Sequence, residues 1–362
     1  MALIHLDSFD SYATNDIVRG WRGDIGLTYF TIRDSGDPEY LLRPNSNVFE
    51  NYGNYGWHVN NYLMSGERLD EILIGFKRKI FDSQEVRCVV IELSNQKGAQ
   101  FSLQLHQDGS ISAWRGSYVN NFLAVSKPDI VRNMVYQQFE MKIKVHDTAG
   151  YWYVRIDGEL VFSGENYDTR YQSLLSGVDR FGIGGQNGDP GSYEDLYVMN
   201  LSGEYNADWL DGARVDCLHP NAPGTNSDWT PDSGTNWDRV SDGGDVDDTQ
   251  YVASSTDGHV DTYHVEDLEV LSGETTIHGV QVRMFATDDE ISGELLPTFY
   301  DGTKYNGSGE LATHNWSSSW ALTTGNEPYS KAPHVWDRDP GGGAWSAATI
   351  NSGEFGVELN IP

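Results

Sequence analysis

The segment YWYVRIDGELVFSGE, Tyr151 to Glu165, decides the fold class. Every second residue up to Ile156 is apolar, which is the period of a strand with one buried face. Asp157 and Gly158 then supply the positive φ angles of a tight turn, and a second apolar run follows. The segment is therefore predicted to be a β-hairpin, with Ile156 facing a core and Arg155 facing away from it.

The same two-residue period recurs on both sides of this hairpin. FEMKIKVHD, residues 139–147, alternates without interruption, and its charged residues, Glu140 among them, are predicted to face away from the core. FSLQLHQDGSISAW, residues 101–114, alternates around a turn at Asp108 and Gly109. Glycine is abundant, with 39 residues, and runs that favour helices are scarce. The sequence therefore predicts an all-β protein built from antiparallel sandwich or jelly-roll sheets.

The length of 362 residues predicts two domains, because single cores usually hold about 100–200 residues. The composition of the sequence changes near residue 206, where long polar stretches begin. We expect a first β-sandwich over residues 1–205 and a second over residues 206–362, ending in the strand of GEFGVELNIP. The polar stretch at residues 221–250 is interpreted as ordered loops, since Trp229 and Trp237 can anchor it, with a disordered linker as the alternative.

The net charge is −30, and it is concentrated in the second half. Residues 1–200 hold 18 Lys and Arg against 26 Asp and Glu, whereas residues 201–362 hold 6 against 28. Such a surface repels phosphate backbones, so nucleic-acid binding is not expected. No secretory signal opens the chain and no run approaches the ~20 apolar residues of a membrane helix. We expect a soluble protein that is made in the cytoplasm and does not insert into membranes.

A set of motifs spans nearly the whole chain. They are DSFDSYATNDIVRGW (7–21), YWYVRIDGELVFSG (151–164), FGIGGQNGDPGSYEDLYVMNLSGEYNADWLDGARVD (181–216), TQYVASSTDGHVDTY (249–263) and GGGAWSAATIN (341–351), the last predicted as a strand. In this order they resemble tailed-bacteriophage virion structural proteins, in which a concanavalin A-like or laminin-G-like module is followed by a second segment. The module alone is compatible with lectins, hydrolases and adhesion domains.

The resemblance implies a structural component of the virion and not a reaction. It predicts a non-enzymatic, oligomeric tail, neck or capsid-surface protein that contacts copies of itself and other virion proteins. The alternative is a carbohydrate-binding host-adhesion protein of the virion, with a host-surface glycan as its partner. A depolymerase would need carboxylates facing one cleft, and the nearest match, Glu67, Asp70 and Glu71, has a spacing that cannot place all three on one strand face.

The loop-like stretch ENYGNYGWHVNNY, residues 50–62, is the candidate sugar site. Sugar sites combine aromatic rings with amide and carboxylate groups that bind hydroxyls. The candidate residues are Tyr52, Tyr55, Trp57, Asn60 and Asn61. Packing of these aromatics onto the sandwich or onto a neighbouring subunit is the competing interpretation.

Two further clusters lie in the second half. Tryptophan is enriched at interface centres, which predicts that the second domain supplies contacts between copies, with burial inside its own domain as the alternative. These tryptophans are Trp316, Trp320, Trp336 and Trp345. The acidic run DGGDVDDTQ offers oxygen donors of the kind that calcium prefers at Asp245, Asp247 and Asp248, with acidic turns free of metal as the alternative. No other cofactor is expected.

Overall fold

The protein is all-β, and its chain divides into two compact units, Met1–Asp216 and Cys217–Pro362. The computed structural model describes residues 3–8, 22–23, 30–33, 48–51, 59–62, 68–80, 88–95, 98–117, 121–171, 177–183, 191–202, 204–241, 249–269, 276–286, 294–306, 330–331 and 334–361. In this part of the chain no helix is long and apolar enough to cross a membrane.

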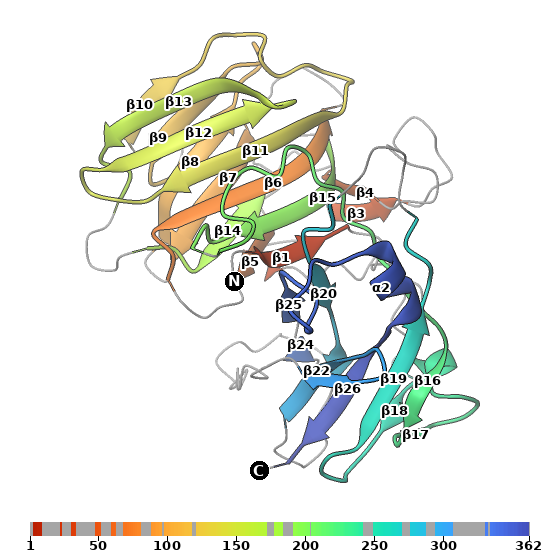
Figure 1. Ribbon diagram of the computed structural model, residues 1–362. Coiled ribbons are helices and arrows are strands. Elements are labelled where there is room, and N and C mark those ends of the chain that lie inside the picture. Colours follow the sequence, from red (N-terminus) through yellow and green to blue (C-terminus); the bar gives the residue numbers. More distant parts are fainter. Residues whose placement is uncertain are drawn as a thin grey trace. The chain divides into compact units, whose positions relative to one another are not determined.

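Two antiparallel sheets form the first unit (Figure 1). One has the order β13 (Glu159–Tyr167), β12 (Gly150–Ile156), β11 (Gln137–Lys144), β6 (Glu71–Ile80), β15 (Gly191–Met199), β4 (Val48–Asn51) and β3 (Phe30–Arg33), with β1 (Leu3–Asp7) also pairing with β15. The other has the order β10 (Asn121–Val125), β9 (Ile111–Arg115), β8 (Gly98–Leu105), β7 (Cys88–Asn95), β14 (Arg180–Ile183), β5 (Val59–Tyr62) and β2 (Arg22–Gly23).

The β12–β13 hairpin confirms the prediction for residues 151–165. Asp157 and Gly158 form its turn with φ angles of 52° and 81°, as a tight hairpin with the right-handed strand twist requires. Ile156 is 4% exposed and packs in the core, whereas Arg155 lies on the outer face. The predicted strand register is therefore correct.

Alternating residues from both sheets make the core of the first unit. The apolar faces predicted for residues 101–114 and 139–147 meet in a single cluster that contains Phe101, Leu103, Leu105, Ile111, Ala113, Phe139, Met141, Ile143 and Val145. Trp152 lies in the same cluster, with its ring centroid 5.7 Å from that of Phe101 on the opposite sheet. Burial of these two inner faces is what holds the sandwich together.

The first unit ends later than the predicted boundary at residue 205, because residues 208–216 dock on the outer face of its β11–β12 region. Within this docking segment, Asp208 pairs with Lys142 at 2.7 Å and Asp211 pairs with Arg155 at 2.8 Å. The two cations lie over the ring of Trp209, at 4.7 and 4.5 Å from its centroid. Ion pairs and cation–π contacts therefore tie the segment to the sheet.

The docking segment also explains why Glu140, predicted to face outward, is 1% exposed. Its Oε1 accepts hydrogen bonds from the Tyr197 hydroxyl at 2.8 Å and from the backbone N–H groups of Leu210 at 2.9 Å and Asp211 at 3.2 Å. Burial and this neighbouring carboxylate raise the pKa of Tyr197 above its ordinary value, so the phenol stays a donor. Glu140 thus lies on the face opposite the core, as predicted, and a segment about 70 residues downstream covers it there.

The second unit is built on a sheet with the order β16 (Pro220–Ser227), β19 (Val260–Val265), β26 (Glu354–Asn360), β22 (Glu294–Tyr300) and β23 (Lys304–Asn306). Three two-stranded pairs accompany it: β17 (Thr230–Pro231) with β18 (Val252–Ala253), β20 (Val280–Val282) with β25 (His334–Trp336), and β21 (Phe285–Ala286) with β24 (Ser330–Lys331). The predicted terminal strand is β26. The predicted ordered loops hold β16, β17 and the short helix η2 (Trp237–Arg239), and Trp229 donates to the carbonyl of His259 at 3.2 Å.

The predicted strand in GGGAWSAATIN is wrong, because this segment contains the helix α2 (Ala347–Ser352). Ser346 caps the helix by accepting a hydrogen bond from the Thr349 N–H at 3.0 Å. Two alanines follow the cap, and alanine has the highest helix propensity. Ile350 anchors the helix in a small core with Phe299, Trp345 and Phe355.

The pKa of Glu354 on β26 predicts how the stability of the second unit changes at acidic pH. Burial opposes its ionisation, but hydrogen bonds from Thr225 (N–H at 2.7 Å, Oγ1 at 2.6 Å) and Thr262 (Oγ1 at 2.6 Å) outweigh this and lower its pKa. A lowered folded-state pKa stabilises the unit above the ordinary value of about 4.3, and this stability is lost as pH falls through the folded pKa.

We expect Glu354→Gln to flatten the fall in melting temperature below about pH 5. Calorimetry of the full chain between about pH 6 and pH 3 measures this. Glu358→Gln, at a half-exposed carboxyl on the same strand, is the control. An acid profile of Glu354→Gln that is unchanged from wild type would contradict the prediction.

Candidate functional site

Strands β8, β9 and β10 present aromatic and polar side chains on the face of their sheet opposite the core. Their core-facing residues alternate with Gln104, Ser112 and Trp114, and Gln104 pairs with Ser112 in register. The register between β9 and β10 shifts between Phe122 and Ala124. This bulge puts Phe122 opposite Trp114 and Val125 opposite Ser112, so both lie on the outer face although they are three residues apart.

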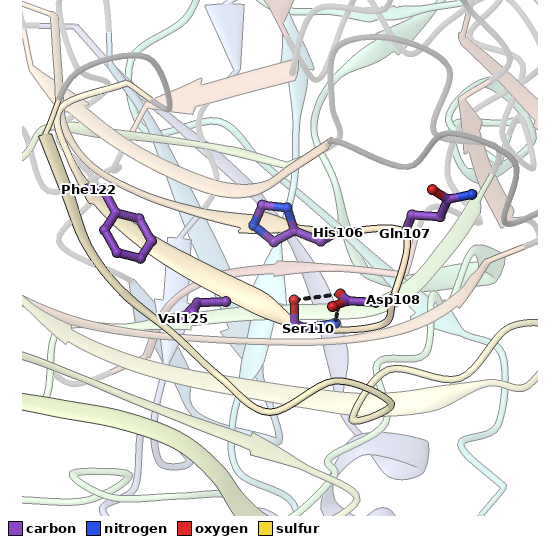
Figure 2. A pocket seen from close by; sticks show the side chains of 6 residues that line it. All are labelled: His106, Gln107, Asp108, Ser110, Phe122 and Val125. Carbon is purple, nitrogen blue, oxygen red and sulfur yellow. Dashed lines mark hydrogen bonds between the residues drawn. The ribbon is translucent and has the colours of Figure 1, made fainter.

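These strands and the β8–β9 turn line an open pocket of about 660 Å³ (Figure 2). Its lining residues are His106, Gln107, Asp108, Ser110, Phe122 and Val125. The ring of Phe122 comes from β10, and the side chains of His106, Gln107 and Asp108 come from the connection between β8 and β9 (Figure 2). Phe122 is 54% exposed, which is unusual for so large an apolar side chain.

The turn at one end of the pocket is held in a fixed shape. His106 N–H donates to the Ser110 carbonyl and Gly109 N–H to the His106 carbonyl, both at 2.9 Å. Gly109 has a φ of 72°, and a Cβ there would lie 2.6 Å from the Val131 carbonyl oxygen. Asp129 N–H donates to the Asp108 carbonyl at 2.8 Å. The segment that holds Asp129 and Val131 therefore supports the turn and leaves room only for glycine at residue 109.

Asp108 carries the charge of the pocket. Its Oδ1 accepts hydrogen bonds from the Ser110 hydroxyl at 2.6 Å and the Ser110 N–H at 3.0 Å. These bonds, the hydroxyl first, lower the pKa of the carboxyl group, to which the nearby His106 also contributes. The side chain is exposed, and among the described residues no hydrogen-bond donor reaches Oδ2. At neutral pH the pocket therefore contains a carboxylate with one oxygen directed by Ser110 and one open to a ligand.

The aromatic end of the pocket is supported from within the sheet. The Trp114 ring packs edge-on against Phe122, with centroids 5.2 Å apart and planes at 73°. Trp114 Nε1 donates to the Ser112 hydroxyl at 2.6 Å, and the same hydroxyl lies 2.6 Å from His106 Nε2. Ser112 is fully buried and thus links the two rings. These side-chain contacts hold the Phe122 ring in place, while its outer surface stays exposed.

Sequence reasoning missed this pocket, although residues 101–114 were analysed for their core face. The available signal was the opposite face of the same segment, where Gln104, Ser112 and Trp114 replace the charged residues of an ordinary outer face. Phe122 and Val125 had no such signal. Strict alternation would send them to opposite faces, and only the bulge brings them together.

The predicted sugar residues lie elsewhere in the chain. Asn60 and Asn61 are in β5, opposite Gly182 and Phe181 of β14, and the row of paired residues from Asn60 continues through Gly182 to Glu92. Strands β14 and β7 separate β5 from β8 in the sheet, so the structure does not bring these asparagines to the pocket. The other three predicted residues fall outside the described residues: Tyr52, Tyr55 and Trp57.

The predicted interface and metal residues are only partly described. Trp345 is 4% exposed in the core of its own unit, and its Nε1 donates to the carbonyl of the half-buried Trp336 at 3.1 Å. Burial within the unit, the alternative left open above, accounts for Trp345 without a subunit contact. Among the described residues no group of three His, Cys, Asp or Glu is placed to hold a metal ion. The remaining predicted residues lie outside the described ones: Trp316, Trp320, Asp245, Asp247 and Asp248.

The carboxylates considered for hydrolysis do not form a cleft among the described residues. Glu71 begins β6 and accepts a hydrogen bond from the Tyr151 hydroxyl on β12. Asp70 precedes it, where its backbone carbonyl accepts from the Val145 N–H at 2.7 Å. Glu67 lies outside the described residues.

Comparison with known proteins finds no matching family model and no matching curated protein. Among solved structures, the chain is similar to Trypanosoma rangeli sialidase in complex with the inhibitor DANA, with 10% identity and a TM-score of 0.33 over 47% of this chain and 27% of that one. It is also similar to the CBM40 of Ruminococcus gnavus IT-sialidase bound to α2,3 sialyllactose, with 17% identity and a TM-score of 0.30 over 42% of this chain and 89% of that one. The chain thus spans about a quarter of the Trypanosoma sialidase and most of the CBM40. The fold class rests on the strand pairing described above.

Proposed function

We propose that this protein binds carbohydrate through the pocket on β8–β10, as a host-adhesion component of a phage virion. One observation carries the binding function: the exposed ring of Phe122 lies in a pocket that also offers the Asp108 carboxylate. Sugars have apolar C–H faces and hydroxyl rims, and such mixed pockets suit them.

The arrangement gives each group a separate task. The Phe122 ring offers a flat apolar surface on which a sugar face can stack, since aromatic side chains bury large areas at little entropic cost. Asp108 Oδ2 accepts a hydrogen bond from a sugar hydroxyl, and bonds to ionised acceptors are stronger than neutral ones. Because the turn and the Trp114 support are already ordered, little conformational freedom is lost on binding.

The virion location is supported by the sequence resemblance to phage structural proteins, which covers both units. A role in host adhesion is consistent with both the virion location and carbohydrate binding, because a virion protein that contacts a host surface meets glycans there. Mass mapping of peptides from purified particles, separated into heads and tails, tests this location. Absence of the protein from particles would contradict the virion location but not the binding function.

The binding function predicts a loss of affinity on Phe122→Ala. We expect the affinity for a polysaccharide that binds the wild type to fall at least about tenfold, or about 1.4 kcal/mol, because the stacking surface is removed. Affinity electrophoresis against a panel of immobilised polysaccharides measures it. Tyr171→Ala, at an exposed aromatic outside the pocket lining, is the matched control and should bind like wild type.

Two results would overturn the binding proposal. Equal affinity of the wild type and Phe122→Ala would place sugar binding elsewhere on the chain. Failure of the wild type to be retained by any polysaccharide would leave the purely structural role in the virion as the better explanation. Release of reducing sugar from a bound polymer would instead indicate a hydrolase.

A further inference from the structure

We infer that the pocket selects neutral glycans over acidic ones and that the carboxylate of Asp108 makes the selection. This inference rests on the proposed function and adds the chemical class of the ligand. It follows from the hydrogen-bonding capacity of the pocket and from its charge.

The hydrogen-bonding argument concerns what Asp108 can accept. Both hydrogen bonds from Ser110 go to Oδ1, which restrains the carboxylate and leaves Oδ2 available to a ligand. An ionised carboxylate only accepts hydrogen bonds. A sugar hydroxyl or an acetamido N–H can donate to it. The carboxylate of an acidic sugar and a sulfate group are themselves acceptors, so neither can pair with Oδ2.

The charge argument points the same way. Asp108 stays ionised at neutral pH because hydrogen bonds from Ser110 favour its charged form. None of the described residues that line the pocket is a lysine or an arginine. Arg115, which follows Trp114 on β9, forms an ion pair with Asp168. The chain as a whole carries −30, so its field also repels polyanions before contact.

Affinity and selectivity therefore reside on different residues. Stacking on Phe122 depends on the shape of the sugar face and applies equally to neutral and acidic rings. Repulsion by Asp108 depends on ligand charge and acts on groups in contact with the exposed carboxylate, because water and salt screen it at longer range. Replacing Phe122 should weaken both ligand classes together, whereas replacing Asp108 should change their ratio.

Asp108→Asn tests the inference while keeping the turn. The amide oxygen can still accept both hydrogen bonds from Ser110, and asparagine suits such turns. The matched control is Asp129→Asn in the adjacent bracing segment, which removes the same charge outside the pocket lining. Asp129 has a φ of 60°, a conformation that asparagine also tolerates.

The full chain and both variants are measured by affinity electrophoresis at about 0.15 M salt, where long-range repulsion is screened beyond about 8 Å. The probes are neutral glucan, galactan and mannan, and acidic polygalacturonate, hyaluronate and polysialate. We expect the wild type to bind a neutral polymer at least tenfold more tightly than any acidic one. Asp108→Asn should lower this ratio of neutral to acidic affinity at least fivefold, and Asp129→Asn should leave the ratio unchanged.

The outcomes separate the two proposals. Preference of the wild type for an acidic polymer, or an unchanged ratio in Asp108→Asn, overturns the selectivity while sugar binding stands. An equal change in Asp129→Asn also overturns it, because general charge and not the pocket would then be responsible. Retention by no polymer overturns selectivity and sugar binding together.

Discussion

Replacing Trp152 by alanine is expected to lower the free energy of unfolding of the first unit by about 3–5 kcal/mol. Trp152 is fully buried, and its ring lies 5.7 Å from Phe101 and Phe162 and 4.8 Å from Tyr167, measured between centroids. Gly164 leaves the space that the indole fills, since a Cβ there would lie 2.3 Å from Trp152 Cζ2. Truncation removes the contact between Trp152 and Phe101 of the opposite sheet and leaves a cavity that rigid strands cannot close.

Hydrogen–deuterium exchange of β12 amides in the full chain, with denaturant unfolding, measures this loss. Leu160→Ala is the matched control, because Leu160 lies on the paired strand β13 and is 57% exposed, and it should change stability by less than about 0.5 kcal/mol. Trp152→Phe should cost less than alanine, since among the described residues Trp152 Nε1 has no hydrogen-bond partner to lose. Equal losses for Trp152→Ala and Leu160→Ala would contradict the placement of Trp152.

Replacing Glu140 by alanine is expected to destabilise the first unit by at least about 1–3 kcal/mol, because three donors lose their acceptor and the buried one among them costs about this much when unpaired. Those donors are the Tyr197 hydroxyl and the N–H groups of Leu210 and Asp211. The docking segment should also loosen, since two of the three belong to it. Limited proteolysis at residues 204–216 reports this directly.

Glu140→Gln is the matched variant, because its amide oxygen can accept the same three hydrogen bonds that Oε1 accepts in the wild type. We expect it to lose less than half as much stability as alanine and to keep the segment resistant to protease. Destabilisation of the two variants to the same extent would show that the charge, and not the acceptor oxygen, holds the segment. A protease-resistant Glu140→Ala would remove the role assigned to this carboxylate.

Local periodicity was sufficient for the β8–β9 and β12–β13 hairpins and for the core face of β11. The core faces of residues 101–114 and 139–147 and the Asp157–Gly158 turn follow from alternation and turn chemistry alone. The helix α2 was missed because six residues are too short to show a helical period. Its signals were local, namely a serine cap at Ser346 followed by two alanines.

Features that depend on distant chain segments could not be predicted. Glu140 has the pattern of an exposed residue, and only the return of residues 208–216 buries it. The pocket requires a bulge in β10, which no two-residue pattern specifies, to bring Phe122 and Val125 to the same face. Asn60 and Asn61 are adjacent in sequence but occupy different cross-strand rows, because successive side chains of a strand point to opposite faces.

The docking segment has a mechanical consequence for the first unit when its carboxyl end is pulled. A pull on residue 216, the carboxyl end of this unit, loads the contacts of Asp211, Trp209 and Asp208 one after another. The hydrogen-bonded strands of the sandwich would be loaded only afterwards. Release of nine residues at about 3.3–3.6 Å each adds roughly 30 Å of contour length. The segment would therefore detach, and lengthen the chain, before the strands of the sandwich separate.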